Sequence, residues 1–428
     1  MSSEIPATEL DTAQVPNDDP QPGTGPRRAA VIFILVTVTL DMLAMGMIAP
    51  VLPRLVTQFL HGNQTRAAEM YGIFATVWAL MQFIFSPLLG SLSDRFGRRP
   101  VVLLSNFGLG LDYLVMALAP TLSWLFIGRV ISGITSASVP TAMAYIADVT
   151  PPAKRSQAFG LISAAFGVGF VLGPALGGVL GNINTRLPFY VAGSMSLLNA
   201  LYGVFILPES LPRERRGKFS WTRANPMGSL VLLRSHVELL GLASVIFLGY
   251  LAHQVLTSTY VLYADYRYHW SDRTVGLSLA VVGICSAIAG AVLVKPAVKI
   301  LGDRNALLLG LVFATAGFAM FGLSRTGILF WFGIPVMCLW GLSGPTAQSL
   351  MTLYVHPDQQ GQLQGAISSL RGLAGLIGPA IFTFSFAFAI RPGSGWHLPG
   401  MPFYLAALFV FLSLILALFV TRKTNATA

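Results

Sequence analysis

Residues 90–100 read Gly-Ser-Leu-Ser-Asp-Arg-Phe-Gly-Arg-Arg-Pro, and this charged stretch separates two apolar segments that are each long enough to cross a bilayer. A turn of this composition has to lie in water at one face of a membrane. Its three arginines assign that face to the cytoplasm, because basic residues accumulate in cytoplasmic loops. The stretch therefore predicts a membrane-spanning chain.

The composition of the whole chain supports this prediction. Of 428 residues, 54% are hydrophobic and only 10% are charged, and the mean hydropathy is +0.69. A soluble core of this size does not need so much apolar material. Apolar runs of helical length predict twelve transmembrane helices. They are expected near residues 29–53, 69–91, 100–119, 122–148, 157–180, 187–207, 237–262, 273–296, 305–324, 327–354, 365–389 and 401–421.

The net charge of +10 could suggest a nucleic-acid partner, but the positions of the basic residues argue against it. With both termini placed in the cytoplasm, most of the 27 lysines and arginines fall in cytoplasmic segments. This asymmetry is an orientation signal and not a surface for polyanions. We expect an integral membrane protein with lipid around it, no nucleic-acid partner and both termini inside.

Breaks in the apolar pattern predict the domain organisation. Residues 1–28 are rich in Pro, Asp and Thr and lack an apolar core, so we expect a disordered cytoplasmic tail. The segment 208–236 is the longest internal break and divides six spans from six. It predicts a cytoplasmic linker between two six-helix bundles. The bundles cover residues 29–207 and 237–421, and a short cytoplasmic tail follows at 422–428.

An internal repeat relates the two halves. At an offset of 205 residues, the segment 138–174 aligns with 343–379 without a gap and matches at 12 of 37 positions. The matches include Gly173-Pro174 with Gly378-Pro379, and shared apolar composition does not easily produce matched Pro and Gly. At the same offset Gly97 meets Gly302, but Asp94 meets Lys299. Two homologous halves are predicted, with the charged turn complete only in the first.

The spacing of Gly90, Asp94, Gly97 and Arg98 resembles the signature loop between the second and third helices of the major facilitator superfamily. The resemblance implies an all-α membrane protein with twelve transmembrane helices in two six-helix halves, which rock around a substrate held between them. It also implies a conformational latch. In this latch Asp94 pairs with Arg98 and faces the helix start near Gly365, where the helix dipole favours negative charge.

The expected span 157–180 carries a second pattern, made of Gly160, Gly169, Gly173, Pro174, Gly177 and Gly178. It resembles the antiporter motif of drug and proton exchangers, and every position of the pattern is filled. Gly169, Gly173 and Gly177 recur every four residues and form a stripe that another helix can approach closely, while Pro174 permits a bend. Ordinary small-residue packing is the alternative interpretation.

A few charged residues fall inside expected spans, where insertion is costly, so each should face a cavity or a partner. We interpret Asp41, Asp112 and Arg129 as proton-coupling residues. A carboxylate near an arginine stays ionised, but it takes a proton when a cationic substrate displaces the arginine or when apolar groups surround it. The alternatives are a permanent ion pair for Asp41 and a bond to Gln82 for Asp112. Arg371 could bind an anionic substrate or only backbone carbonyls.

Polar side chains inside other spans are candidates for a substrate-binding wall, although neighbouring helices could equally satisfy them. They are Gln82, His253, Gln254, Tyr260, Gln348, Gln364 and Arg371. Because Asp41 and Asp112 both belong to the first half, we expect the cavity to be negative on that side. A cationic or zwitterionic substrate should then bind with its positive end toward the spans 29–53 and 100–119.

Larger parts of the chain resemble the tetracycline-efflux branch of the drug and proton antiporters, through Asp41 to Pro53, Ala79 to Val102 and Gly128 to Thr135 among others. The chain departs from that branch where it has Cys285 in place of a histidine, and it has no acid in the span 305–324. These departures put tetracycline itself in doubt as the substrate.

The resemblance implies a proton-coupled exporter of amphipathic organic compounds that works by alternating access as a monomer. The proton gradient would drive it, with no resident cofactor or metal. The sequence shows no phosphate-binding glycine loop, no HExxH and no nucleophile elbow, so we expect neither an enzyme nor an ATP-driven pump. The alternatives are a proton symporter or facilitator for a sugar or organic anion, and a membrane sensor that no longer transports.

Overall fold

The computed structural model describes residues 26–136, 138–150, 155–216, 228–356, 359–393 and 397–422. The expected tails lie almost wholly outside these described residues. Within them, every regular element is a helix, as the apolar periodicity predicts. Helices satisfy their own backbone groups, which an apolar bilayer cannot do.

The described residues of the first half form eight α-helices. They are α1 (Pro26–Ile48), α2 (Leu52–Phe59), α3 (Gln64–Phe96), α4 (Arg98–Leu118), α5 (Leu122–Thr135), α6 (Ser138–Val149), α7 (Arg155–Ile183) and α8 (Leu187–Ile206). Two short helices follow in the predicted linker, η2 (Arg213–Arg215) and η3 (Gly228–Arg234). The second half has α9 (Val237–Ser258), α10 (Tyr260–Tyr268), α11 (Asp272–Ile288), η4 (Ala289–Leu293), α12 (Val294–Leu323), α13 (Gly327–Cys338), η5 (Leu339–Leu342), α14 (Ser343–Thr352), α15 (Gln360–Ile390) and α16 (Met401–Val420).

Several expected spans are not single helices. The first expected span is broken between α1 and α2 at Pro50, because proline cannot donate the backbone hydrogen bond that would continue the helix. The spans expected at 122–148, 237–262 and 327–354 are also each divided into two main helices, although no proline lies at these breaks. In the opposite sense, α12 joins the end of one expected span to the next across Gly302, whose φ of 75° interrupts the helical geometry.

Ten helical stretches of the described chain are long and apolar enough to cross a membrane. The stretch Asp272–Leu323 among them holds two crossings, one on each side of Gly302, and the shorter Leu122–Thr135 continues into α6. Most α-helices carry both buried and exposed large apolar residues. This distribution suits helices that pack on one side and face hydrocarbon on another.

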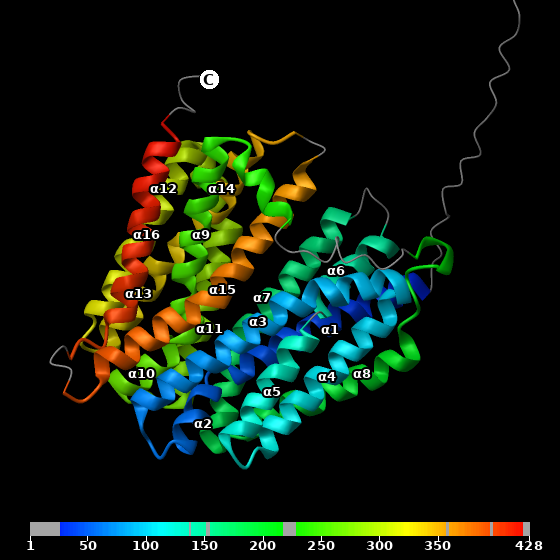
Figure 1. Ribbon diagram of the computed structural model, residues 1–428, viewed down its shortest axis with the longest axis horizontal. Helices are drawn as coiled ribbons and strands as arrows, with labels where there is room; N and C mark the ends of the chain where they lie inside the picture. Colours follow the sequence, from blue (N-terminus) through cyan, green and yellow to red (C-terminus); the bar gives the residue numbers. More distant parts are fainter. Residues whose placement is uncertain are drawn as a thin grey trace, which may run out of the picture.

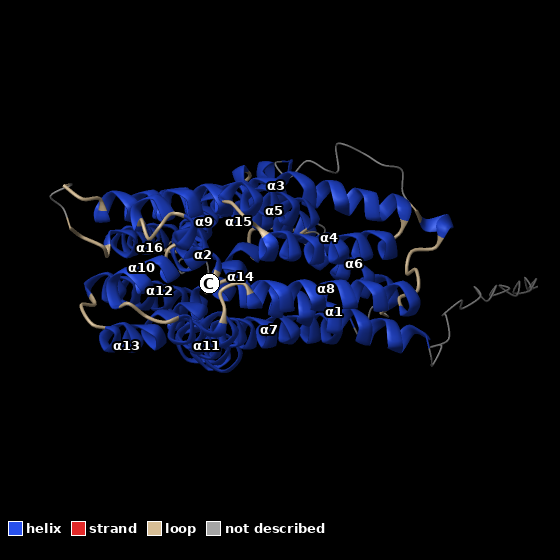
Figure 2. Ribbon diagram, turned by 90° about the horizontal axis from the view of Figure 1, so that it is seen from below, coloured by secondary structure: helices blue, strands red, loops and turns tan. Residues whose placement is uncertain are grey.

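The helices form two bundles that lie side by side (Figure 1). Helices α1 to α8 make one bundle and α9 to α16 the other. The interface between them is formed mainly by two helix pairs, α7 with α11 and α3 with α15. Figure 2 shows α7 beside α11 and, on the other flank of the interface, α3 beside α15.

The sequence repeat has a structural counterpart. Helices α6 and α14 begin 205 residues apart, at Ser138 and Ser343, and α7 and α15 also begin 205 residues apart. Pro174 lies inside α7 and Pro379 inside α15. The common offset supports the predicted homology of the two halves.

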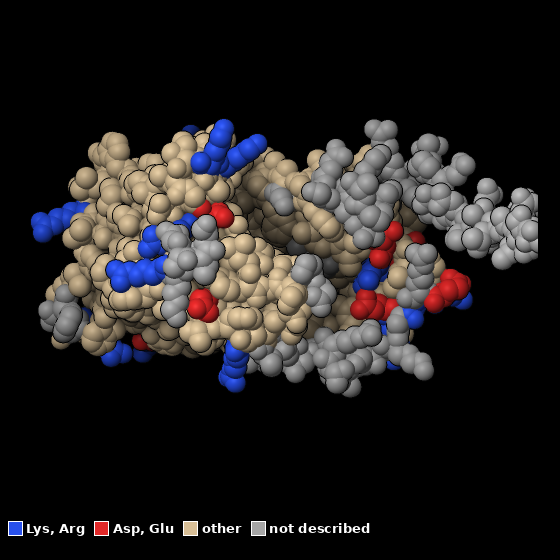
Figure 3. All heavy atoms as spheres, turned by 90° about the horizontal axis from the view of Figure 1, so that it is seen from above, with Lys and Arg blue, Asp and Glu red and all other residues tan. Residues whose placement is uncertain are grey.

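The two ends of the bundles differ. We call the end that carries the loop 94–98 and the ends of the described chain the terminal end, and the other the opposite end. Space-filling atoms seen from the terminal end leave a hollow between the two bundles (Figure 3). At the opposite end the bundles touch, because α3 and α15 pack closely at Gly72 and Thr383, far from the loop.

Candidate functional site

The predicted proton-coupling residues meet inside the first half. Asp41 on α1 is 4% exposed and Asp112 on α4 is completely buried. Tyr113, which follows Asp112 on α4, interacts electrostatically with Asp112, Asp41 and Arg129. Sequence reasoning did not single out Tyr113, although its position next to Asp112 was a usable signal. Tyr113 therefore lies within electrostatic range of both acids and of the arginine.

The partners of Asp112 lie on α5. Its Oδ1 atom would lie 2.8 Å from a Cβ atom at Gly128, so the carboxylate packs directly on the α5 backbone beside Arg129. Asp112 interacts there with Arg129 and Ser132. The alternative partner, Gln82, is half-buried on α3. The guanidinium of Arg129 also stacks over a ring of α3, that of Trp78, at 5.2 Å.

Burial separates both acids from the hollow between the bundles. Helix packing covers the side chains of Asp41 and Asp112, so neither carboxylate lines the hollow in this conformation. The expectation that the substrate cavity is negative on the side of the first half stays a prediction. Whether an acid faces the cavity or a neighbouring helix depends on the rotation of its own helix about the helix axis. Isolated acids in apolar spans do not reveal this rotation.

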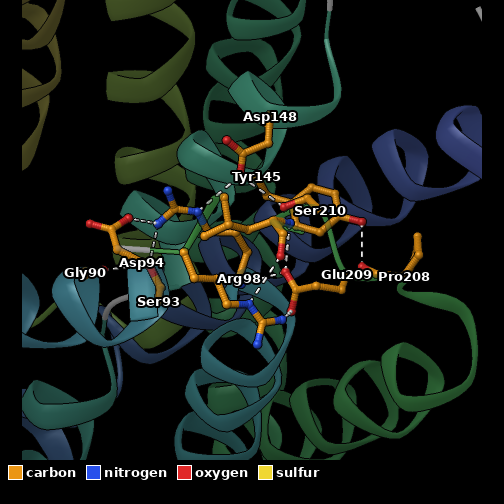
Figure 4. A network of polar contacts seen from close by, with 11 residues as sticks. Gly90, Ser93, Asp94, Arg98, Tyr145, Asp148, Pro208, Glu209 and Ser210 are labelled. Atoms are coloured by element: carbon orange, nitrogen blue, oxygen red, sulfur yellow. Dashed lines mark hydrogen bonds and ion pairs between the residues drawn. The ribbon is translucent and has the colours of Figure 1, made fainter. Parts of the chain in front are cut away.

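The loop of the predicted latch is built around Arg98 (Figure 4). The Nη1 atom of Arg98 lies 2.5 Å from Asp94 Oδ1 and donates to Ser93 Oγ at 2.6 Å, and its Nε atom contacts Asp148 Oδ2 on α6 at 3.2 Å. The predicted Asp94–Arg98 pair is thus formed. Asp148 was not predicted, although an acid at the end of a span that returns to the same face was a usable signal.

A second acid, Glu209, fastens the start of the predicted linker to this loop (Figure 4). Its Oε1 atom accepts hydrogen bonds from the backbone nitrogens of Arg98, at 2.8 Å, and Leu211, at 3.0 Å, and its Oε2 atom lies 3.8 Å from Arg216. A Cβ atom on Gly97 would overlap Glu209 Oε2, and Gly97 also has a φ of 108°. The positive φ is what favours glycine at residue 97, because the end of the flexible Glu209 side chain could shift to admit a Cβ atom.

The latch does not reach the second half in this conformation. Among the described residues, the ion-pair and hydrogen-bond partners of Asp94 and Arg98 all belong to the first half or the linker. The expected contact of Asp94 with the start of α15 is therefore absent here, because the hollow separates the bundles at the terminal end. Gly90 faces open space for the same reason, since a Cβ atom on it would meet no atom within 4 Å.

The glycine stripe on α7 packs against α1, as its spacing predicts. A Cβ atom on Gly173 would lie 2.7 Å from the Cα atom of Gly46, and one on Gly177 would overlap the carbonyl oxygen of Met47. Gly169 meets Met42 in the same way, at 2.5 Å. Gly46 is the residue on α1 that makes this approach possible.

Pro174 and Gly178 of the motif connect α7 to the second half. A Cβ atom on Gly178 would overlap the carbonyl oxygen of Asp272, and one on Gly276 would overlap the carbonyl oxygen of Pro174. The motif therefore places α7 between α1 and α11. Gly160 differs from the others, since a Cβ atom there would lie in open space, with no other atom within 4 Å.

Ion pairs join the two bundles at the opposite end, and no clear sequence pattern indicates them. The Nη2 atom of Arg54 on α2 lies 3.1 Å from Asp265 Oδ1 on α10 and donates to the Trp270 carbonyl oxygen at 2.9 Å. Its Nη1 atom lies 2.9 Å from Asp272 Oδ1 on α11. Gln64 on α3 donates to Asp265 Oδ2 at 2.8 Å. We call Arg54, Asp265 and Asp272 the Arg54 cluster.

The candidates for a substrate wall occupy different environments. His253, Gln364 and Arg371 are exposed, whereas Gln82, Gln254 and Gln348 are half-buried. Tyr260 is completely buried, and its ring lies 5.2 Å from that of Phe330 and 6.5 Å from that of Phe321. Tyr260 is therefore part of the aromatic core of the second half and does not face the hollow in this conformation.

Comparison with known proteins assigns this chain to a family. A family model described as Major Facilitator Superfamily matches residues 34–379, which is most of the chain. The chain belongs to the Major Facilitator Superfamily. The predicted twelve-helix fold and the resemblance carried by the loop 90–100 are thereby confirmed.

Within the Major Facilitator Superfamily, the chain is similar to tetracycline resistance proteins. It is 40% identical over 384 residues to the class C protein of Escherichia coli, which covers 89% of this chain and 95% of that protein. It is 37% identical over 375 residues to the class G protein of Vibrio anguillarum, with coverage of 86% and 93%. A solved bacterial homologue of the human lysosomal transporter Spinster shares the fold, with a TM-score of 0.74 at 16% identity, covering 93% of this chain and 98% of that one.

Proposed function

We propose that this protein is a proton-coupled exporter of amphipathic organic compounds that works by alternating access. The observation that carries the proposal is the difference between the two ends: a hollow at the terminal end and the Arg54 cluster bridging the bundles at the opposite end. A transporter of this fold needs a state of this kind, in which a site between the halves is open to one side only. Similarity to drug-resistance proteins supports a drug-like substrate and a transporter rather than an enzyme.

The terminal end faces the cytoplasm in this proposal. The basic loop at 94–99 lies at that end, and the positive-inside rule favours its cytoplasmic placement. Both chain ends then lie in the cytoplasm of a bacterial cell, and the hollow would collect substrate from the inner face of the membrane. The protein would act as a monomer. The proton gradient would drive transport, and no resident cofactor would be needed.

The proton site in this proposal is the cluster of Asp41, Asp112 and Arg129 around Tyr113. Arg129 favours the ionised form of a nearby carboxylate, whereas burial favours the protonated form. A small movement of α5 relative to α4 would alter that balance, because Asp112 packs on the α5 backbone at Gly128. Proton uptake and release would thereby be tied to the rocking of the first half.

The test uses purified protein in proteoliposomes with an imposed pH gradient. Tetracycline and a panel of cationic, neutral and anionic amphiphiles are tested for uptake into the vesicles. Antiport predicts that an acidic lumen accelerates uptake of a substrate, because protons leave as the compound enters. Uptake driven by an acidic exterior would instead show a symporter, and counterflow that is absent for every compound would favour a non-transporting sensor.

The same assay tests the proton site. Asp41→Asn keeps the shape of the side chain but removes its titratable proton, so gradient-driven uptake should fall to the level of empty vesicles. Glu214→Gln is the matched control, because Glu214 is an exposed acid of η2 in the linker. Gradient-driven transport at the wild-type rate in Asp41→Asn would exclude Asp41 from proton coupling.

A further inference from the structure

We propose that the second half carries an anion-binding subsite for the substrate, built from Arg371 on α15 with Tyr250 and His253 on α9. The exported compound would accordingly carry a carboxylate or similar anionic group beside an aromatic or apolar body. This inference rests on the proposed export function and specifies its substrate class.

Arg371 is held in place by a ring and not by an acid. Its guanidinium carbon lies 5.1 Å from the centre of the Tyr250 ring. A cation–π contact at this distance restrains the guanidinium group, and it uses none of its N–H donors. Those donors match the two oxygens of a carboxylate. Since Arg371 is exposed, a ligand can reach them.

The face of α9 that carries Tyr250 also carries His253, because residues three apart lie on the same side of a helix. The His253 ring lies 5.8 Å from the Trp340 ring of η5. This face is therefore flanked by α15 on one side and by η5 on the other, yet His253 remains exposed. The next residue of α15 after Arg371, Gly372, packs on Phe83 of α3 in the other bundle, where a Cβ atom would lie 2.9 Å from the ring. This part of α15 therefore borders the space between the bundles.

The subsite lies well inside the membrane. Arg371 is eleven residues beyond the start of α15 at Gln360, which places it roughly 16 Å along the helix. Gln254, one turn beyond Tyr250 on α9, packs against Gly378 of α15 and closes the space between the two helices on the side of the opposite end. An amphiphile that entered from the terminal end would therefore meet Arg371 before it met this closed contact.

The charge of Arg371 is not compensated within the described residues, where no carboxylate lies within ion-pairing distance of it. An arginine keeps its charge in a protein, and a lone charge at this depth is costly. Arg129 in the first half likewise has no carboxylate within ion-pairing distance among the described residues, but it interacts electrostatically with the buried Asp112. The charge presented to the hollow by the second half is therefore positive, and a negative substrate group would compensate it.

The test measures the binding of two fluorescent probes, 1-pyrenebutyrate and its uncharged primary amide, to the purified full chain. Binding is followed by energy transfer from tryptophan to pyrene. Wild type should bind the carboxylate about tenfold or more tightly than the amide, since charge-assisted hydrogen bonds exceed neutral ones by roughly that factor. Arg371→Gln should reduce the affinity for the carboxylate to that for the amide and leave the amide unchanged. Unchanged amide binding also shows that the variant is folded.

Three further variants sharpen the assignment. Arg371→Lys keeps the charge but loses the planar donors, so its preference for the carboxylate should be intermediate. Tyr250→Phe keeps the ring and should bind the carboxylate like wild type, whereas Tyr250→Leu should lose several-fold. Arg325→Gln is the matched control, because Arg325 is an exposed arginine between α12 and α13 at the opposite end.

Equal affinity of wild type for the two probes, or binding of neither, would overturn the anion subsite. So would an Arg371→Gln variant that weakens both probes alike. These outcomes are separate from the fate of the export function. If gradient-driven uptake of other amphiphiles persists without a carboxylate preference, only the subsite is wrong. If the preference is present but an acidic lumen drives no uptake of any compound, the subsite stands and proton-coupled export fails.

Discussion

The two ends of the molecule use ion pairs in different ways. At the opposite end, Arg54 of one bundle is paired with Asp265 and Asp272 of the other. At the terminal end, Arg98 has two acidic partners as well, but both belong to its own bundle. The number of charges therefore does not decide which end is closed. What decides it is whether the partners come from different halves.

Burial adds to the difference. The Asp272 side chain in the Arg54 cluster is 4% exposed, whereas the Asp94 side chain in the terminal loop is 51% exposed. Exposed ion pairs are worth about 0–1 kcal/mol, but removal of one partner from a buried pair costs about 3–5 kcal/mol. The opposite end should therefore be far more sensitive to the loss of one charge than the terminal end.

The largest expected effect is that of Arg54→Gln. This change leaves Asp272 buried without its cation, so the sealed state should lose about 3–5 kcal/mol relative to one open at the opposite end. Spin labels at Gln58 on α2 and Leu329 on α13, both exposed, measure the separation of the bundles at that end. A longer distance component should appear, and transport should fall strongly. Arg66→Gln, at an exposed arginine of α3, is the control and should leave the distances unchanged.

An unchanged distance distribution in Arg54→Gln would mean that the glycine contacts alone hold the opposite end together.

The glycine contacts between α7 and α11 can be tested separately, with Gly276→Ala. The added methyl would overlap the Pro174 carbonyl oxygen, which is backbone and cannot move aside easily. Overpacking of this kind costs about 1–3 kcal/mol, so the bundles should separate at this end and transport should decrease.

Gly160→Ala is the matched control within the glycine motif. It adds the same methyl group where the structure has open space, and alanine favours a helix over glycine by about 1 kcal/mol. Thermal stability should therefore be equal or slightly higher, with transport retained. If Gly160→Ala stops transport while the protein stays folded, this glycine needs its small size in another conformation.

Asp94→Asn should have a smaller effect on the present conformation, because it weakens only a half-exposed pair within one bundle. The substitution should instead destabilise the state in which the terminal end is closed, because Asp94 is expected to meet the start of α15 in that state. A cysteine pair at Phe96 and Gln362, both exposed, should then crosslink less often than in wild type. Unchanged crosslinking would mean that this loop only sets the orientation of the chain in the membrane.

The smallest effect is expected from Arg391→Gln. Arg391 also joins the two bundles at the opposite end, through Glu69 on α3 at 3.7 Å. Both side chains are partly solvated, with 63% and 31% exposure, so the pair should contribute less than about 1 kcal/mol. The spin-label distances should remain those of wild type. A shift as large as that of Arg54→Gln would show that burial is not what distinguishes these two pairs.

The sequence was sufficient for the fold because apolar length, the repeat and the glycine spacing can be read directly from the order of the residues. Twelve spans and the offset of 205 residues could be predicted in this way, whereas the Asp94–Arg98 pair was implied by the family resemblance. Helix breaks were predicted poorly, since Pro50 was taken as part of a continuous span although its missing donor ends α1. Glycines such as Gly46 remained unnoticed because their importance depends on which helix lies opposite.

The candidate site was only partly predictable, for reasons of geometry. The resemblance and the cost of buried charge led to Asp41, Asp112 and Arg129, but their orientation depends on helix rotation, which short-range patterns do not encode. The Arg54 cluster joins residues more than two hundred positions apart and exists only when the opposite end is closed. Contacts that form in only one conformation of the chain produce no repeating sequence pattern from which they could be predicted.

The turn at Gly97 has a counterpart in the second half with a similar backbone conformation. Gly302, 205 residues later, also has a positive φ, 75° beside 108°, and a ψ of 164° beside 160°. Yet Lys299 stands where the first copy has Asp94, and the neighbouring Asp303 accepts a hydrogen bond from Ser349 instead. The backbone shape of this turn is therefore shared by the two halves although the charges around it differ. The turn and the Asp94–Arg98 ion pair are separable features of the chain.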